Sequence, residues 1–159
     1  MFVDYQEQLQ QKQNRLSKVA KRIAFTKQTC LVREAPQSLG YRNRAQLKSD
    51  GVKLGYVAKG SHELADVTEC PVLTDVNQRQ LATLRKTLPN RDWRPSKHQQ
   101  WTTLDIDDER GTPLINQRQA FRQGNSDQNK QLRKWLSAKL ASLRMPGSVF
   151  EFFCGSGNL

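Results

Sequence analysis

The chain has 159 residues, with 26 Lys and Arg against 15 Asp and Glu and a net charge of +11. It contains no apolar run of the roughly 18 residues that a membrane-spanning helix needs, and no apolar signal-peptide core. Its three cysteines are far apart and odd in number, which argues against a disulfide framework and a local C-x-x-C metal site. We therefore expect a cytoplasmic location without a membrane partner.

The positive charge is concentrated at the start of the chain. The first 60 residues hold 12 Lys and Arg against 4 Asp and Glu, whereas the remainder holds 14 against 11. Such an excess indicates a polyanionic partner, with nucleic acid first and a membrane surface second. A basic surface that is simply solvated is the alternative, and composition alone leaves it open.

Residues 4–23 predict an amphipathic helix of about 20 residues. Asp4 is placed to cap its start, and Glu7 is placed to complete a capping box. The apolar face carries Leu9, Leu16, Val19, Ala20 and Ile23, and the basic face carries Lys12, Arg15, Lys18, Lys21 and Arg22. Such a helix can lie on a membrane surface. The absence of Trp from its apolar face favours packing on a domain with the basic face outward.

Residues 40–57 predict a basic hairpin. Polar and apolar residues alternate over 40–48, Ser49-Asp50-Gly51 is a turn, and 52–57 return as a second strand. The hairpin would present four cations to solvent or RNA, namely Arg42, Arg44, Lys48 and Lys53. Tyr41 and Tyr56 beside them could stack on bases. An ordinary hairpin with a polar outer face explains the pattern equally well.

The middle of the chain predicts alternating short elements. They are a strand at 65–67, a helix capped by Thr74 or Asp75 and ending before Pro89, a polar loop at 90–100 and a strand at 101–106. The turn at 107–111 is acidic, but its residues do not follow the order of an EF-hand loop. We therefore expect a solvated acidic hairpin tip.

The last 46 residues predict a strand at 114–121, a helix capped by Asn125 or Ser126, and a strand beginning at Val149. The last strand leads into Gly155-Ser156-Gly157. A strand followed by a glycine turn is how open α/β sheets bind nucleotide-like cofactors, although a buried strand with an ordinary connection is the alternative. The helix that should follow is not reached before Leu159, so we expect a fragment.

Four blocks of residues stand in a fixed order along nearly the whole chain. They are Tyr5-Gln6-Glu7-Gln8-Leu9 with Lys12-Gln13; Gly40-Tyr41-Arg42-Asn43-Arg44 with Leu54-Gly55-Tyr56; Gly60-Ser61-His62-Glu63-Leu64 to Glu69-Cys70-Pro71-Val72; and Phe121-Arg122-Gln123-Gly124-Asn125 before Phe153-Cys154-Gly155-Ser156-Gly157-Asn158. Together they resemble the S-adenosylmethionine-dependent RNA uracil-C5 methyltransferases, which make 5-methyluridine in transfer and ribosomal RNA.

The resemblance implies an α+β fold in two parts. Residues 1–120 would be a central RNA-facing domain with antiparallel strands and flanking helices. Residues 121–159 would be the first helix and strand of a Rossmann-like class I methyltransferase α/β domain. The implied reaction transfers a methyl group from S-adenosylmethionine to C5 of uridine in tRNA or rRNA. A stand-alone basic RNA-binding module is the alternative, although the blocks from Phe121 to Asn158 would then have no purpose.

The resemblance also implies roles for individual residues. Contacts to S-adenosylmethionine would come from Gln123, Phe153, Gly155, Gly157 and Asn158, and the target-base cleft from Phe121 and Asn125. Cys70 matches the last of four cysteines that hold a [4Fe-4S] cluster in many members, and the other three are absent. We therefore expect a cluster only in a longer parent protein. The family's nucleophilic cysteine and general base lie downstream of Asn158, so we assign no catalytic residue here. The expected partner is RNA rather than DNA, and the parent is expected to be monomeric.

Overall fold

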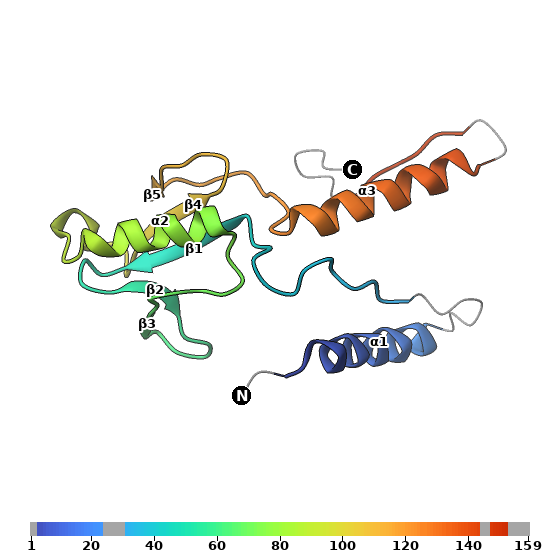
Figure 1. Ribbon diagram of the computed structural model, residues 1–159, viewed down its shortest axis with the longest axis horizontal. Coiled ribbons are helices and arrows are strands. Elements are labelled where there is room, and N and C mark those ends of the chain that lie inside the picture. Colours follow the sequence, from blue (N-terminus) through green and yellow to red (C-terminus); the bar gives the residue numbers. More distant parts are fainter. Residues whose placement is uncertain (1–2, 24–30, 144–146, 153–159) are drawn as a thin grey trace. The chain divides into compact units, whose positions relative to one another are not determined.

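The computed structural model describes residues 3–23, 31–143 and 147–152 (Figure 1). Contacts divide the chain into two compact units, Met1–Ser38 and Leu39–Leu159. Within the described residues the fold is α+β, with three α-helices and a five-stranded antiparallel sheet. The predicted α+β class is therefore confirmed.

Helix α1, Tyr5–Arg22, forms the first unit together with the segment that follows it. The Asp4 carboxylate accepts from the Gln6 N–H at 2.9 Å and caps the helix as predicted. Glu7 does not close a capping box, since its carboxylate accepts from the Gln11 side chain at 3.3 Å. The Ala35 N–H donates to the Tyr5 hydroxyl at 2.7 Å, which ties the following segment to α1.

The second unit is built on a sheet with the strand order β3-β2-β1-β4-β5. Its strands are β1 Arg44–Ser49, β2 Leu54–Val57, β3 Leu64–Asp66, β4 Thr102–Asp107 and β5 Leu114–Ile115. Strand β1 is central and pairs with β4 over its whole length, from Arg44↔Asp107 to Ser49↔Thr102. The predicted hairpin of β1 and β2 is confirmed, because Ser49 pairs with Leu54 across the turn.

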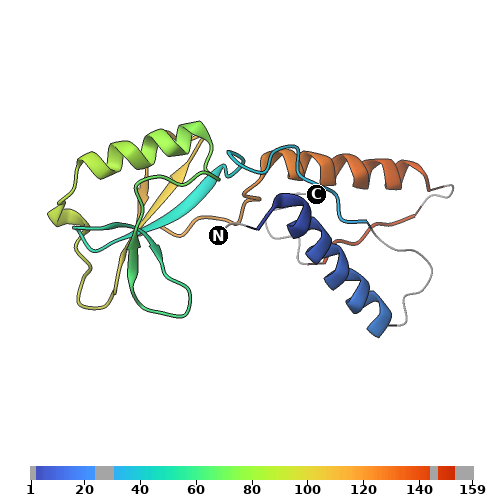
Figure 2. The same ribbon diagram turned by 60° about the horizontal axis from the view of Figure 1, so that its bottom comes forward.

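Helix α2, Asp75–Lys86, lies over one face of this sheet (Figures 1 and 2). Thr74 caps it, as predicted. The alternation in β1 directs Ala45 and Leu47 into the hydrophobic core, and β4 contributes Leu104 and Ile106 to the same core. The buried cluster consists of Ala45, Leu47, Leu54, Leu73, Leu81, Leu84, Trp93, Leu104 and Ile106. Trp93 belongs to a short 3-10 helix, Arg91–Trp93, within the stretch that was predicted to be a polar loop.

The predicted strand 114–121 is wrong after its first two residues. Asn116 has a positive φ of 52°, which turns the chain out of the extended conformation. Its side chain and backbone then close on β4, since Asn116 Oδ1 accepts from the Thr103 N–H and Asn116 N–H donates to Thr103 O, both at 2.9 Å. The residues from 117 to 124 follow as a segment without helix or strand.

Helix α3, Ser126–Ala141, is capped by Asn125, as predicted. The strand predicted at Val149 is not formed by residues 149–152. Val149, Phe150 and Phe152 are all exposed. An apolar strand is stable only when it is paired and covered, and no other described strand pairs with these residues. The sheet of the described residues is antiparallel throughout, and 153–159, which include the Gly-x-Gly turn, lie outside them.

Candidate functional site

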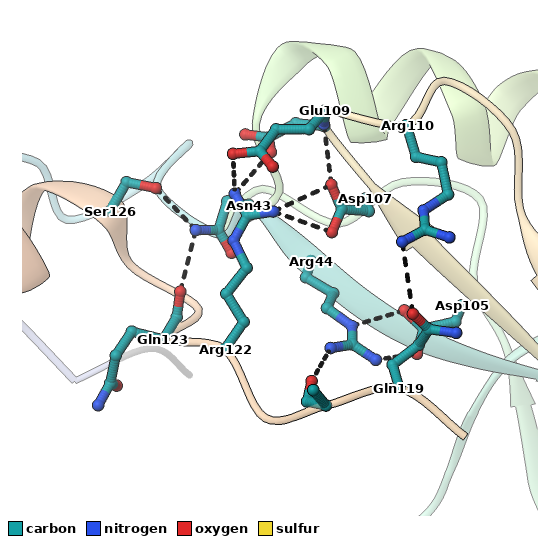
Figure 3. A network of polar contacts seen from close by, with 12 residues as sticks. Asn43, Arg44, Asp105, Asp107, Glu109, Arg110, Gln119, Arg122, Gln123 and Ser126 are labelled. Atoms are coloured by element: carbon teal, nitrogen blue, oxygen red, sulfur yellow. Dashed lines mark hydrogen bonds and ion pairs between the residues drawn. The ribbon is translucent and has the colours of Figure 1, made fainter. Parts of the chain in front are cut away.

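A buried ion pair lies at the start of the central strand. The Arg44 guanidinium donates to both carboxylate oxygens of Asp105, at 2.7 and 2.5 Å, and to the carbonyl of Ala120 at 2.8 Å (Figure 3). The Asp105 residue is only 3% exposed. The prediction that Arg44 is exposed to solvent or RNA is therefore wrong. Its guanidinium instead binds the carboxylate of Asp105, which lies 61 residues later in the sequence.

Both members of this pair stay charged near neutral pH. The hydrogen bond to Asp105 raises the pKa of Arg44 above its ordinary value, although burial opposes the rise. Burial would raise the pKa of Asp105, but hydrogen bonds from Arg44 and Gln46 outweigh it and hold that pKa below its ordinary value. The pair is thus a structural tie between β1, β4 and Ala120.

A second arginine, Arg122, forms ion pairs with the acidic residues at the end of β4 and in the turn after it. Arg122 contacts Asp107 at 3.1 Å, Glu109 at 2.7 Å and Asp108 at 3.5 Å. Asp107 and Asp108 are mostly buried, and burial raises the pKa of Asp108. The prediction of a solvated acidic tip is therefore wrong for these two residues. The turn provides the acidic partner that holds Arg122.

Asn43, which directly precedes β1, binds the end of the segment 117–124 and the start of α3. Its backbone N–H donates to Gly124 O at 3.0 Å, and its side-chain amide donates to Gln123 O at 3.0 Å and to Ser126 Oγ at 2.7 Å (Figure 3). Asn43 is 1% exposed. Sequence reasoning did not single out Asn43 or Arg122. For Asn43, the available sequence signal was that a polar residue occupies a core-facing position in the alternating pattern of residues 40–48.

Two of the predicted residues, Phe121 and Gln123, lie on this anchored segment of residues 117–124, and Asn125 directly follows it. Phe121 is 72% exposed and helps to line a hollow of about 500 Å³ beside Arg110. The Gln123 side chain points away from the polar contacts in Figure 3. The Asn125 side chain accepts from the Gln128 N–H at 2.9 Å, so it caps α3. The ligand contacts of these residues stay predictions, and Phe153, Gly155, Gly157 and Asn158 lie outside the described residues.

The other predicted RNA-binding cations differ in how much they project. Arg42 and Lys53 are exposed, whereas Lys48 is half-buried. Arg42 Nε donates to Arg44 O at 3.1 Å, and Lys48 Nζ donates to Thr103 Oγ1 at 2.7 Å. On α1, by contrast, the cations of the basic face are all exposed: Lys12, Arg15, Lys18, Lys21 and Arg22. Two of the four predicted hairpin cations are thus exposed, compared with all five on the basic face of α1.

Cys70 is half-buried beside α2. Its N–H donates to Gln78 Oε1 at 3.0 Å, and its sulfur lies 4.0 Å from the Tyr56 hydroxyl. Burial, together with the neighbouring Cys70, raises the pKa of Tyr56 to about 12. No group of three His, Cys, Asp or Glu side chains that could hold a metal occurs in the described part of the chain. Those residues therefore do not fit an iron–sulfur cluster by themselves.

The fold and the anchored segment can now be set beside known proteins. No family model matches the chain. The chain is homologous to proteins that are named RNA methyltransferases. It is 41% identical, over 99% of its length, to an uncharacterized RNA methyltransferase of Nitrosomonas europaea, and it spans 42% of that relative. Over 57% of the chain, the identity is 36% and 33% to uncharacterized RNA methyltransferases of Synechocystis and Nostoc, and the match spans 21% of each.

The same described residues bear on membrane association. None of their helices combines the length and the apolar character that crossing a bilayer requires.

Proposed function

We propose that this chain is the RNA-facing part of an RNA methyltransferase that methylates C5 of uridine in tRNA or rRNA. The observation that carries the proposal is the 41% identity to a protein named an RNA methyltransferase over 99% of the chain. The four ordered blocks supply the finer assignment to uracil C5. The cytoplasmic location, the monomeric state and the division at residue 121 belong to the same proposal.

S-adenosylmethionine, when bound, would supply an electrophilic methyl group. The residues here would bind and orient it, with Gln123 and the glycine turn of Phe153, Gly155, Gly157 and Asn158 forming one wall. Phe121 would face the target base. Its exposed ring is the kind of surface on which an unstacked base packs. Asn125 is committed to capping α3, so we propose that it shapes the cleft rather than touching the base.

Catalytic chemistry in this proposal needs residues from the rest of a longer protein. Uracil methylation at C5 begins with addition of a thiolate to C6, followed by methyl transfer from the cofactor sulfur to C5. Removal of the C5 proton then expels the thiolate from C6 and restores the double bond. No residue of the present sequence is assigned to the nucleophile or the base. A Rossmann-like domain, of which 121–159 would be the beginning, would complete the cofactor cleft.

The test compares the 159-residue chain with a protein restored to the length of its Nitrosomonas relative. Calorimetry measures S-adenosylmethionine binding, and a tritium-methyl assay measures transfer to uridine-containing RNA. We expect very weak cofactor binding and no transfer by the chain alone, and both activities in the restored protein, because a cofactor of this size needs a closed pocket. A restored protein that methylates another base or position would refute the uracil-C5 assignment. Complete inactivity would refute the methyltransferase proposal.

A stand-alone RNA-binding module is the second candidate. It is favoured by the five exposed cations on α1, which need no cofactor domain to bind phosphate. Tight RNA binding by the chain alone, with an inactive restored protein, would support this candidate over the first.

A further inference from the structure

The segment from 117 to 124 forms neither helix nor strand, yet its backbone is held at several points. Arg44 donates a hydrogen bond to Ala120 O at 2.8 Å, and Asn43 donates to Gln123 O and Gly124 O at 3.0 Å each. These donors come from adjacent residues at the start of the central strand. A loop that is held in this way is ordered before any ligand arrives.

Arg122 holds the segment from within. Its guanidinium contacts Asp107 at the end of β4 and Glu109 on the turn that follows, at 3.1 and 2.7 Å. Arg122 lies between Phe121 and Gln123 in the sequence, so fixing it restrains both neighbours. The contacts described use backbone carbonyls and the Arg122 side chain rather than the Gln123 amide. Figure 3 shows the Gln123 side chain directed away from them.

We propose that Asn43 and Arg122 are positioning residues, which hold the backbone so that Phe121 and Gln123 present their side chains to a ligand. This inference rests on the proposed function, which makes the ligand S-adenosylmethionine together with the target uridine. Order that exists before binding reduces the conformational entropy that binding must remove. Neither residue touches the reacting atoms, so each acts through the segment.

The first test measures amide hydrogen exchange on the 159-residue chain. The backbone N–H of residue 43 donates to Gly124 O, so its exchange rate reports whether the segment stays docked. We expect Arg122→Gln to speed this exchange about tenfold, and Asn43→Ala to do the same, relative to Leu47 in the same strand. Unchanged exchange at residue 43 in Arg122→Gln would overturn the proposal, because the two anchors would not act on one segment.

Two variants serve as matched controls. Arg118→Gln removes an exposed arginine four residues from Arg122. Ser49→Ala removes a fully buried hydroxyl at the far end of the strand, where Ser49 Oγ donates to Lys53 O at 2.8 Å. We expect both to leave exchange at residue 43 unchanged relative to Leu47.

The second test measures methyl transfer in the protein restored to the relative's length. We expect Asn43→Ala and Arg122→Gln to lower kcat/KM about tenfold, while the Kd for RNA stays the same. Arg122→Lys keeps one charged donor and should recover part of the loss. An equal loss in Ser49→Ala would show that stability alone is responsible and would overturn the positioning role. A restored protein without any transfer refutes the proposed function, whereas the exchange test still decides whether the two anchors order the segment.

Discussion

At the scale of the residue, several side chains of the second unit have partners that are distant in sequence. Arg85 reaches both Asp66 oxygens, at 2.6 and 3.0 Å, and Arg44 reaches Asp105. Gly55 is constrained by packing rather than by its backbone angles, because a Cβ at this position would lie 2.0 Å from Ala65 O. Two single substitutions test these points.

Gly55→Ala should strongly destabilise the second unit. The added methyl would force β2 away from β3, and overpacking of this kind costs about 1–3 kcal/mol. Urea denaturation followed by circular dichroism gives the change in unfolding free energy. Gly124→Ala is the control, since nothing lies within 4 Å of its Cβ position. Equal stability of the two variants would contradict the close approach of β2 and β3.

Asp105→Asn should flatten the acid dependence of stability. The folded pKa of Asp105 is lowered, so its contribution is fully present above the unfolded value of about 3.9 and is lost as pH falls through the folded value. In the variant, Arg44 loses its charged partner, and unfolding at neutral pH should become easier by about 3 kcal/mol. Thermal unfolding between pH 2 and 7 checks both effects; parallel curves for the two proteins would show that the pair does not titrate with folding.

At the scale of the element, α1 and α3 are alike in burial but differ in how their charged residues are placed. Neither has a buried residue among those described. The carboxylates of α1 lie near its start, at Asp4 and Glu7, and its exposed cations follow over Lys12 to Arg22. On α3, Lys130 lies 3.3 Å from Asp127, which reduces its charge locally. Helix α1 is therefore the stronger candidate for phosphate contacts.

Replacing Lys18, Lys21 and Arg22 by Gln should weaken RNA binding and reduce its salt dependence. Each lost phosphate contact on single-stranded RNA changes the slope of log K against log salt by about 0.7, so three contacts reduce it by roughly 2. Fluorescence anisotropy with a uridine-containing hairpin, at several salt concentrations, measures the slope. The matched control replaces Arg133, Lys134 and Lys139 on α3. If this control lowered the slope equally, binding would depend on total charge rather than on α1.

At the scale of the whole molecule, the buried hydrophobic cluster lies entirely within the second unit, from Ala45 to Ile106. The first unit contributes charge and no member of that cluster. The polar contacts of Asn43, Arg44 and Arg122 connect this core to the segment that carries Phe121 and Gln123. Stability and RNA affinity should therefore separate between the two units.

A chain of residues 39–159 should retain the cooperative unfolding of the second unit, because all of the described buried cluster is present in it. It should lose much of the salt-dependent RNA binding, because the cations of α1 are removed. Calorimetric unfolding and the anisotropy assay measure the two properties on the same sample. A truncated chain that fails to fold, or that binds RNA as tightly as before, would contradict this separation.

The sequence by itself determined the local structure. The caps at Asp4, Thr74 and Asn125 and the alternation along β1 depend on neighbouring residues, whereas the α+β class was implied by the family resemblance. The ordered blocks also led to the methyltransferase resemblance, which the relatives support at the level of RNA methyltransferases.

Only the tertiary structure decided which charged side chains are accessible. Arg44 and Lys48 alternate with core residues as solvent-facing cations would, but β4 places Asp105 and Thr103 beside them. The acidic turn likewise meets Arg122 instead of water. An ion pair between residues 61 or 15 positions apart has no signature in local periodicity, because charge attraction depends on distance in space rather than along the chain. The positions of Asn43 and Arg122 as anchors are visible only once the sheet brings their partners together.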